Sequence, residues 1–137
     1  MRSIERFSSG APWEPVAGYS RAVRAGDRIL VAGTTATLPD GEIAGLGDPG
    51  AQTRRAIVNI EAALALAGAA LADVVRTRIY VTDIARWEDV ARAHGDAFRV
   101  HPPVTTMVQV AALIDPRMLV EIEAEAVVAA RDPARRA

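Results

Sequence analysis

The order in which strand-like and helix-like stretches follow one another constrains this chain more than any other feature of its sequence. Short runs rich in β-branched residues predict strands, and two longer runs with apolar residues at helical spacing predict helices. Along the chain the expected order is β-β-β-α-β-α-β-β. A length of 137 residues fits one domain with a useful core and leaves no room for a second. We therefore expect a single α/β (α+β) domain built on a six-stranded mixed sheet.

Three strands are expected before the first helix, at Ile4–Phe7, Tyr19–Arg24 and Arg28–Ala32. The second and third form a hairpin, because a Gly-Asp turn lies between two β-prone runs. The stretch from Ser8 to Gly18 is rich in Ser, Gly and Pro and is predicted to be a loop. The remaining strands are expected at Val75–Val81, Val104–Ala112 and Met118–Val128.

The two helices carry clear boundary signals. Asp48 and Pro49 supply an N-cap acid and a proline at the first helical position, and Gly68 is the expected C-cap. The second helix covers Trp87–Phe98 and stops before a pair of prolines. Two helices of this length cover only one face of a six-stranded sheet. The other face carries Val, Ile, Thr and Ala, so we expect a second copy of the chain to cover it in a homo-oligomer.

The domain is expected to span residues 1–130, followed by a solvated tail at residues 131–137. Acids and bases are interspersed and the formal charge is −1. Nucleic-acid binding normally needs a basic excess or stripe, and single-strand binding needs aromatic stacking surfaces, which are scarce here. No apolar run approaches the roughly 20 residues that span a bilayer. We therefore expect a cytoplasmic protein that binds neither nucleic acid nor membrane.

Absent residue types exclude several mechanisms. The chain has no cysteine, which excludes disulfides, thiolate nucleophiles and zinc–thiolate sites. All 16 basic residues are arginines, which excludes a lysine Schiff base. The two histidines lie in no metal-ligand spacing, and no glycine-rich nucleotide-binding motif occurs. Any chemistry must use carboxylates, hydroxyls, arginines, backbone amides and water, so we expect neither a metal nor a cofactor.

Several strings in this element order resemble the RidA (YjgF-type) family of small trimeric proteins. They lie after the hairpin, in the first helix, in the middle strand and in the last two strands: Val31–Thr34, Gln52–Ile60, Arg78–Asp83, Pro103–Val110 and Val120–Ala124. The resemblance covers the chain from about Ser8 to Val128. It implies a chorismate-mutase-like trimer in which the sheets line a central barrel. It also implies a small-molecule site in each cleft between subunits.

The resemblance assigns candidate site residues one by one. Tyr19 and Gly33 fall at the tyrosine and glycine positions of the family's ligand pocket. Glu121 falls at the acidic position that would hold or activate a hydrolytic water. The backbone amides near Gly33 and Thr106 would stabilise developing charge. These positions imply hydrolysis of a reactive enamine or imine to a carbonyl product and ammonia.

The chain departs from the family pattern inside this pocket. Ala32 stands where serine is usual, and Met107 stands where cysteine is frequent. Thr105 replaces the arginine that clamps a substrate carboxylate, so the chain resembles an arginine-lacking branch. Hydrogen bonds to charged groups contribute roughly 1.5–3 kcal/mol each, and a threonine offers one neutral donor instead. Either the ligand has no carboxylate at this point, or another arginine supplies the charge, and Arg78 on the middle strand is the candidate for that role.

Two interpretations of the charged residues stay open. Glu121 alternates with Glu123 and Glu125 on one face of the last strand, so the three could instead be cross-strand partners of Arg76 and Arg78. Two functions stay open as well. The first is a hydrolase of the enamine/imine deaminase type, and the alternative is a non-catalytic trimer that binds a small metabolite. A ribonuclease or translation inhibitor, a name often attached to the family, is disfavoured by the neutral charge.

Overall fold

The computed structural model describes residues 3–128, and the predicted tail at residues 131–137 lies outside this range. Its sheet has six strands in the order β1-β2-β3-β6-β4-β5. Strands β4 and β5 pair in parallel, and the other neighbours pair antiparallel, so the sheet is mixed as expected. The strands are β1 (Ile4–Phe7), β2 (Ala22–Ala25), β3 (Arg28–Thr34), β4 (Val74–Val81), β5 (Val104–Gln109) and β6 (Val120–Val127).

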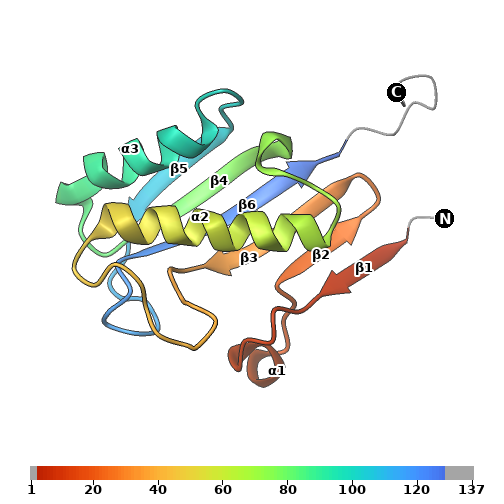
Figure 1. Cartoon of the computed structure of the whole chain (residues 1–137), viewed down its shortest axis with the longest axis horizontal. Helices are drawn as coiled ribbons and strands as arrows, with labels where there is room; N and C mark the ends of the chain where they lie inside the picture. Colours follow the sequence, from red (N-terminus) through yellow and green to blue (C-terminus); the bar gives the residue numbers. More distant parts are fainter. Residues whose placement is uncertain (1–2, 129–137) are drawn as a thin grey trace.

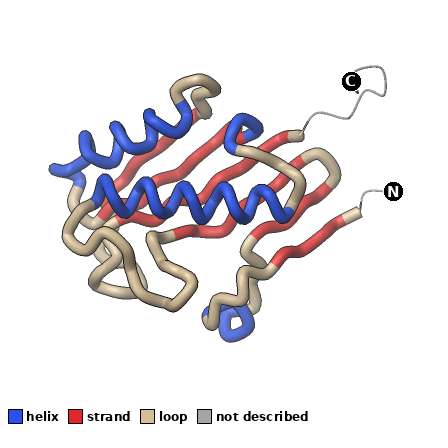
Figure 2. The backbone as a smooth tube through the Cα atoms, viewed as in Figure 1, coloured by secondary structure: helices blue, strands red, loops and turns tan. Residues whose placement is uncertain are grey.

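Helices α2 (Pro49–Leu66) and α3 (Trp87–Phe98) lie side by side on one face of this sheet (Figures 1 and 2). This arrangement confirms the prediction of two helices on one face. The described part of the chain also contains three short helical segments: α1 (Trp13–Ala17) and the 3-10 helices η1 (Leu71–Asp73) and η2 (Ile84–Arg86). In Figure 1, α1 lies beyond the end of β1, below α2.

Helix α2 begins and ends where its sequence signals predict. The Asp48 side chain accepts a hydrogen bond from the Ala51 amide at 3.0 Å, and Pro49 occupies the first turn. Gly68 has φ of 84°, the left-handed conformation that terminates a helix and that glycine adopts without strain. The buried side of α2 packs on β3 and β6. It contributes Ile60 and Leu64, whose burial stabilises the fold by about 1.5–3 kcal/mol each.

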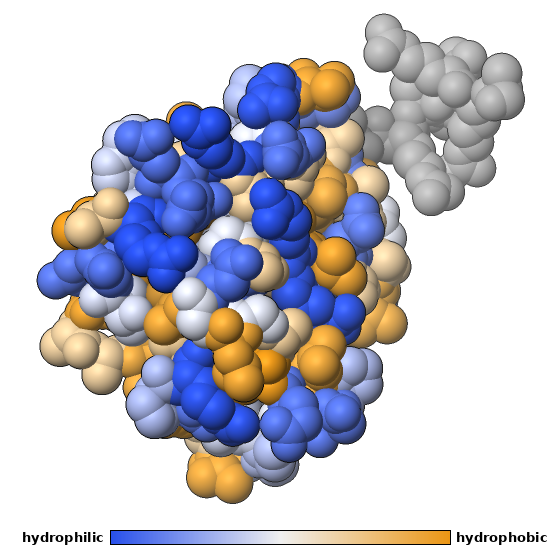
Figure 3. Space-filling view, turned by 60° about the vertical axis from the view of Figure 1, so that its left-hand side comes forward, coloured by the Kyte–Doolittle hydropathy of each residue, from blue (hydrophilic) through white to orange (hydrophobic). Residues whose placement is uncertain are grey.

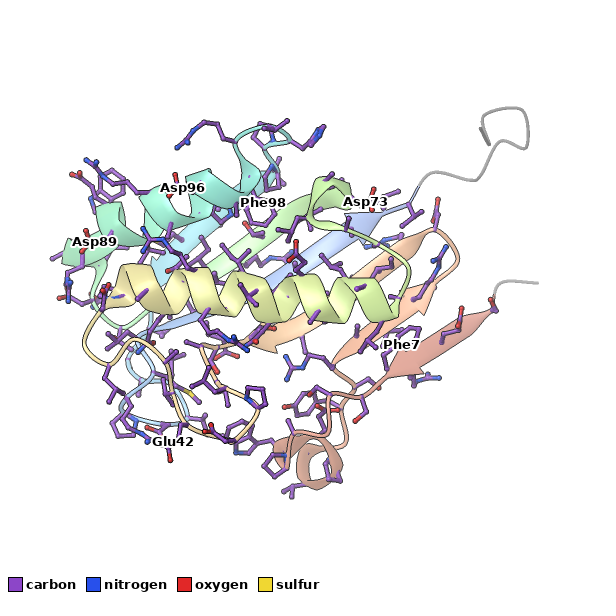
Figure 4. All side chains as sticks on the ribbon, in the orientation of Figure 1. Phe7, Glu42, Asp73, Asp89, Asp96 and Phe98 are labelled. Carbon is purple, nitrogen blue, oxygen red and sulfur yellow. The ribbon has the colours of Figure 1, made fainter. Side chains whose placement is uncertain are left out.

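Successive side chains of β6 point to opposite faces of the sheet. Val120, Ile122, Ala124 and Ala126 are buried under the helices, whereas the intervening glutamates are partly exposed on the opposite face. On α3, Phe98 points toward the sheet while Asp89 and Asp96 point away (Figure 4). Figure 3 shows hydrophilic residues over much of the face that it presents, with smaller hydrophobic groups between them.

The predicted loop at Ser8–Gly18 is wrong in part, because it contains helix α1. The carboxylate of Glu14 accepts hydrogen bonds from the amides of Ser9 and Ala11 at 3.3 Å and from the Ser9 hydroxyl, which folds this segment back on itself. Gly18 then ends the helix with φ of 74°. A helix of five residues is too short to show an apolar repeat in the sequence.

Three strands are also shorter than expected, among them β2, which begins at Ala22 instead of Tyr19. Strand β5 ends at Gln109 instead of Ala112, and β6 begins at Val120 instead of Met118. Met118 belongs to the turn before β6, where its amide bonds the carbonyl of Asp115 at 3.0 Å. Its side chain is buried in a small second cluster with Ala36 and Ile43.

Within residues 3–128, no helix is long and apolar enough to cross a membrane.

Candidate functional site

The centre of the candidate site is a β-bulge in β3. Val31 pairs with Ala124 and Thr34 pairs with Ile122, so three steps along β3 match two steps along β6. The extra residue lies at Ala32-Gly33 and interrupts the regular ladder. Bulges re-aim nearby side chains, and here the interruption lies next to Glu121, which neighbours Ile122 on β6.

Glycine is needed at position 33 because the Glu121 side chain lies too close to leave room for a Cβ. Its backbone angles do not require glycine, since its φ is not positive. The nearest atoms to a Cβ added at position 33 all belong to Glu121, with Cδ at 3.0 Å and Oε1 closer still. Any larger residue would therefore occupy the space that the Glu121 carboxylate now fills. The requirement for glycine at position 33 is therefore steric.

A cavity of about 960 Å³ opens beside this bulge. Four of the predicted site residues line it: Tyr19, Ala32, Gly33 and Glu121. Its other walls come from α1, from the loop after β3 and from one side of α2. Most of these wall residues are apolar or small, including Trp13, Val16, Pro39, Ala62, Leu66, Ile114 and Met118. A partly apolar cavity with a few polar groups is typical of small-molecule sites.

Arg21 is a cavity residue that the sequence did not single out. Its Nη1 donates to the carbonyl of Gly33 at 2.8 Å and to the Thr34 hydroxyl at 3.0 Å. Its Nη2 donates to the Tyr19 hydroxyl at 3.4 Å, and its guanidinium lies 5.7 Å from the Tyr19 ring centre. Arg21 thus fixes both the bulge and the tyrosine. In the sequence it looks like any other strand arginine, so no local signal marked it.

Glu121 has the electrostatic properties of a group that accepts protons. Burial raises the pKa of its carboxyl above 4.5, the Arg21 charge lowers it in part, and Glu123 raises it again. The net shift is upward. A partly desolvated carboxylate is a stronger base than one in water. It can therefore hold a water molecule and take its proton.

Helix α2 adds two polar residues to the cavity one turn apart. The amide of Asn59 donates to the carbonyls of Thr35 at 2.9 Å and Thr37 at 2.8 Å, which anchors the loop after β3. Arg55 lines the cavity at the preceding turn. Its Nε is buried and has no hydrogen-bond partner among the described residues. No sequence signal distinguished Arg55 from its neighbour Arg54.

Arg78 does not line this cavity. Its Nη1 lies 3.3 Å from the Glu125 carboxylate and 3.9 Å from that of Glu123. Tyr80 donates its hydroxyl hydrogen to Glu123, which raises the pKa of Tyr80. The cross-strand pairing considered for Arg78 is therefore the one observed, and Glu121 is the glutamate of β6 that faces the cavity.

The predicted residues Thr105, Thr106 and Met107 lie elsewhere in the chain, on the edge strand β5. The Thr105 hydroxyl is 2.8 Å from that of the buried Thr77, whose oxygen is also 2.8 Å from His94 Nε2. Met107 packs against the main core, and Thr106 is exposed. None of the three lines the cavity. Within one chain, the predicted site residues therefore form two separate groups.

No group of three or more His, Asp or Glu side chains within residues 3–128 is arranged to hold a metal ion. The polar side chains at the cavity are instead one carboxylate, two guanidinium groups, one phenol, one amide and the hydroxyls of Ser9, Thr34, Thr35 and Thr37. Such a set suits a small organic ligand with polar or charged ends. Glu121 can act on the ligand as a base, and the two arginines can bind a negative charge.

Known proteins match this chain over nearly the whole domain. The model of the family described as Endoribonuclease L-PSP matches residues 9–128. An uncharacterized protein of Streptomyces coelicolor, SCO2049, is 43% identical over 90% of this chain and 92% of its own length.

Two solved structures show the same architecture. Rv2704 of Mycobacterium tuberculosis, described as a member of the YjgF/YER057c/UK114 family, is 56% identical with a TM-score of 0.85. The match covers 92% of this chain and all of that one. TdcF of E. coli, solved with bound serine, is 26% identical with a TM-score of 0.75, over 90% of this chain and 94% of its own. The chain therefore belongs to the L-PSP endoribonuclease family, which is the YjgF or RidA family.

Proposed function

We propose that the cavity beside Gly33 is a small-molecule site in which a reactive enamine or imine is hydrolysed to a carbonyl product and ammonia. The observation that carries this proposal is the position of Glu121. Its half-buried carboxylate, with a raised pKa, reaches over a bulge glycine into a cavity of about 960 Å³. This is the arrangement that general-base activation of water requires.

The proposed reaction uses only water and groups of this chain. Glu121 holds a water molecule and takes its proton while the water oxygen bonds to the imine carbon. The protonated carboxyl gives that proton to the nitrogen, which yields a carbinolamine. Glu121 then takes the proton of the new hydroxyl group and passes it to the amine nitrogen, so that the carbonyl forms, the carbon–nitrogen bond breaks and ammonia leaves. Arg21 holds the Gly33 carbonyl with a hydrogen bond of 2.8 Å and orients Tyr19 with one of 3.4 Å. The backbone amides near Gly33 and Thr106 stabilise the developing charge.

A homotrimer is part of this proposal. Tyr19, Ala32, Gly33 and Glu121 line the cavity, whereas Thr105, Thr106 and Met107 lie on the far edge strand β5. A neighbouring copy can bring its β5 to the cavity and complete the site at a cleft between subunits. The exposed, partly apolar side of β5, with Val104 59% and Val108 44% exposed, supports such a contact. Arg78 can bind a ligand in the same cleft only if its ion pair with Glu125 breaks.

Family structures support a small ligand with amino-acid-like chemistry, since TdcF of E. coli was solved with bound serine. A serine molecule fits easily in a cavity of this volume. The same site without turnover would make the protein a metabolite-binding trimer, which is the alternative outcome of the experiment below.

The test is ammonia release from freshly generated imines of several amino acids and amines. It compares the wild type with Glu121→Gln, which keeps the shape of the side chain and removes its basicity. The matched control is Glu125→Gln, on the same strand and face but outside the cavity. We expect turnover to fall at least about a hundredfold in Glu121→Gln, the usual effect of losing a general base, and to persist in the control. Absent turnover in the wild type, or equal turnover in Glu121→Gln, would reject the catalytic role.

The subunit arrangement needs its own measurement. Light scattering of the purified chain should give the mass of three copies of a 14.5 kDa protein. A monomer would leave β5 unable to reach the cavity and would reject the cleft, although the cavity within one chain would remain.

A further inference from the structure

The cavity extends well beyond the space around Glu121. Along α2 its lining runs from Arg55 through Asn59, Ala62 and Ala63 to Leu66. Between Arg55 and Leu66 an α-helix rises about 16 Å, so the cavity is an elongated groove along α2. Its volume of about 960 Å³ is at the upper end of the usual range of about 300–1,000 Å³ for ligand sites. A three-carbon imine would fill only a small part of it.

The two ends of the groove differ in character. Alanine and leucine side chains of α2 line one part, together with Val16 and Ala17 of α1. Arg55 supplies a positive charge at the opposite end of the α2 wall. An apolar wall and, at one end, a guanidinium without a partner among the described residues favour a ligand with a hydrocarbon body and an anionic head.

Arg55 differs from Arg21 in what its guanidinium does. Arg21 already donates to the Gly33 carbonyl, the Thr34 hydroxyl and the Tyr19 hydroxyl. The side chain of Arg55 makes neither an ion pair nor a hydrogen bond with any residue in the 3–128 range, and its Nε is buried without a partner. Leaving a buried charged donor unsatisfied is costly, and a bound anion would remove that cost.

We propose that Arg55 binds the carboxylate of an elongated ligand whose apolar body lies along the groove beside α2. The inference rests on the proposed function only in using the same cavity. It also accounts for Thr105, because a carboxylate held by Arg55 needs no arginine on β5. The guanidinium forms two parallel hydrogen bonds with a carboxylate, which gives it preference for that group over a neutral amide.

The test measures binding with probes that cannot react: butanoate, hexanoate and octanoate, each beside its primary amide. Isothermal titration calorimetry should show the wild type binding each acid about tenfold or more tightly than its amide, the range expected for charge-assisted hydrogen bonds. Affinity should rise from butanoate to octanoate as more of the groove is filled.

Arg55→Gln should remove the preference for the acid, and Arg55→Lys should keep part of it. The control is Arg54→Gln, the next residue on the same helix, which is exposed and does not line the cavity. It changes the net charge equally and should keep the full preference.

Three results would overturn the inference. They are equal affinity of acid and amide in the wild type, no binding of any probe, or the same loss in Arg54→Gln as in Arg55→Gln. The outcome is independent of turnover. A wild type that fails to release ammonia but binds the acids through Arg55 would reject the proposed hydrolysis and keep this inference. A wild type that releases ammonia but shows no preference for acids over amides would keep the proposed hydrolysis and reject this inference.

Discussion

The carboxylate of Glu121 lies directly over the α-carbon of Gly33, in the space where any other residue would have its Cβ. Two features of the chain create this contact. The bulge in β3 interrupts the ladder with β6, and the residue at the bulge has no side chain. Together they let a glutamate of a regular strand reach a cavity at the sheet's end. The geometry of the proposed base therefore depends on a residue that itself has no functional group.

Gly33→Ala should abolish turnover while leaving the fold nearly intact. The added methyl group meets only the far end of the Glu121 side chain, which can rotate away at little cost. We expect less than about 1 kcal/mol of change in the free energy of unfolding. Ammonia release should fall as much as in Glu121→Gln. Combining the two substitutions should cause no further loss, since both act on one group. Additive losses would contradict this account.

Gln52 should be among the polar residues on which stability depends most. It is fully buried, its Oε1 accepts the Leu119 amide at 2.8 Å, and its Nε2 donates to the Arg117 carbonyl at 2.9 Å. Gln52→Leu leaves these backbone groups unpaired, and each costs about 1–3 kcal/mol in unfolding free energy. Gln109→Leu is the control, because the exposed Gln109 accepts the Ile84 amide at 3.0 Å and water can replace it. Urea denaturation should separate the two clearly, and equal losses would refute the prediction.

His94 should make stability decrease below about neutral pH. Burial lowers its pKa from 6.5, and its Nε2 lies 2.8 Å from the Thr77 hydroxyl. Because the unfolded chain binds the proton more tightly, stability is full above pH 6.5 and falls as the pH decreases through the lowered pKa. Denaturation at a series of pH values should show this slope in the wild type and in His101→Gln, whose histidine is exposed. The slope should be absent in His94→Gln, and its persistence there would exclude His94 as the cause.

Glu14 should make the stability of the fold depend on pH in a more acidic range than His94 does. Burial by itself would raise the pKa of its carboxyl, but hydrogen bonds from Ser9, Ser8 and Ala11 outweigh it, and the net pKa lies below 4.5. The stabilisation is present above pH 4.5 and is lost as the pH falls through the lowered value. Glu14→Gln should therefore be less stable than the wild type at neutral pH, and the difference should shrink in acid. Glu61→Gln, on the exposed side of α2, should show no such convergence.

The sequence was sufficient for the parts of the fold that depend on local signals. Asp48, Pro49 and Gly68 define α2 by capping chemistry alone, and the alternating glutamates of β6 mark its open face. The family resemblance also assigned Glu121 and Gly33 to one pocket, and the two residues are in contact beside the cavity. Helix α1 was missed because a turn held by one carboxylate leaves no periodic pattern.

The cavity arginines could not be predicted, because their roles depend on contacts between distant parts of the chain. Arg21 acts through a carbonyl in the next strand, across the hairpin. Arg55 differs from Arg54 only in which side of α2 meets the groove, and that side is fixed by packing on the sheet. Arg78 was the candidate from the sequence because it lies on the middle strand. Its pairing with Glu125 became visible only once the strand register was known.

The pH dependence of imine hydrolysis tests the central claim most directly, since it reports the protonation of the group that activates water. After subtraction of the uncatalysed rate, the wild-type rate should rise with pH through an apparent pKa above 4.5, the ordinary value of the Glu121 carboxyl. The residual rate of Glu121→Gln should show no such rise. A wild-type profile that is flat across this range, or the same rise in Glu121→Gln, would contradict Glu121 as the base.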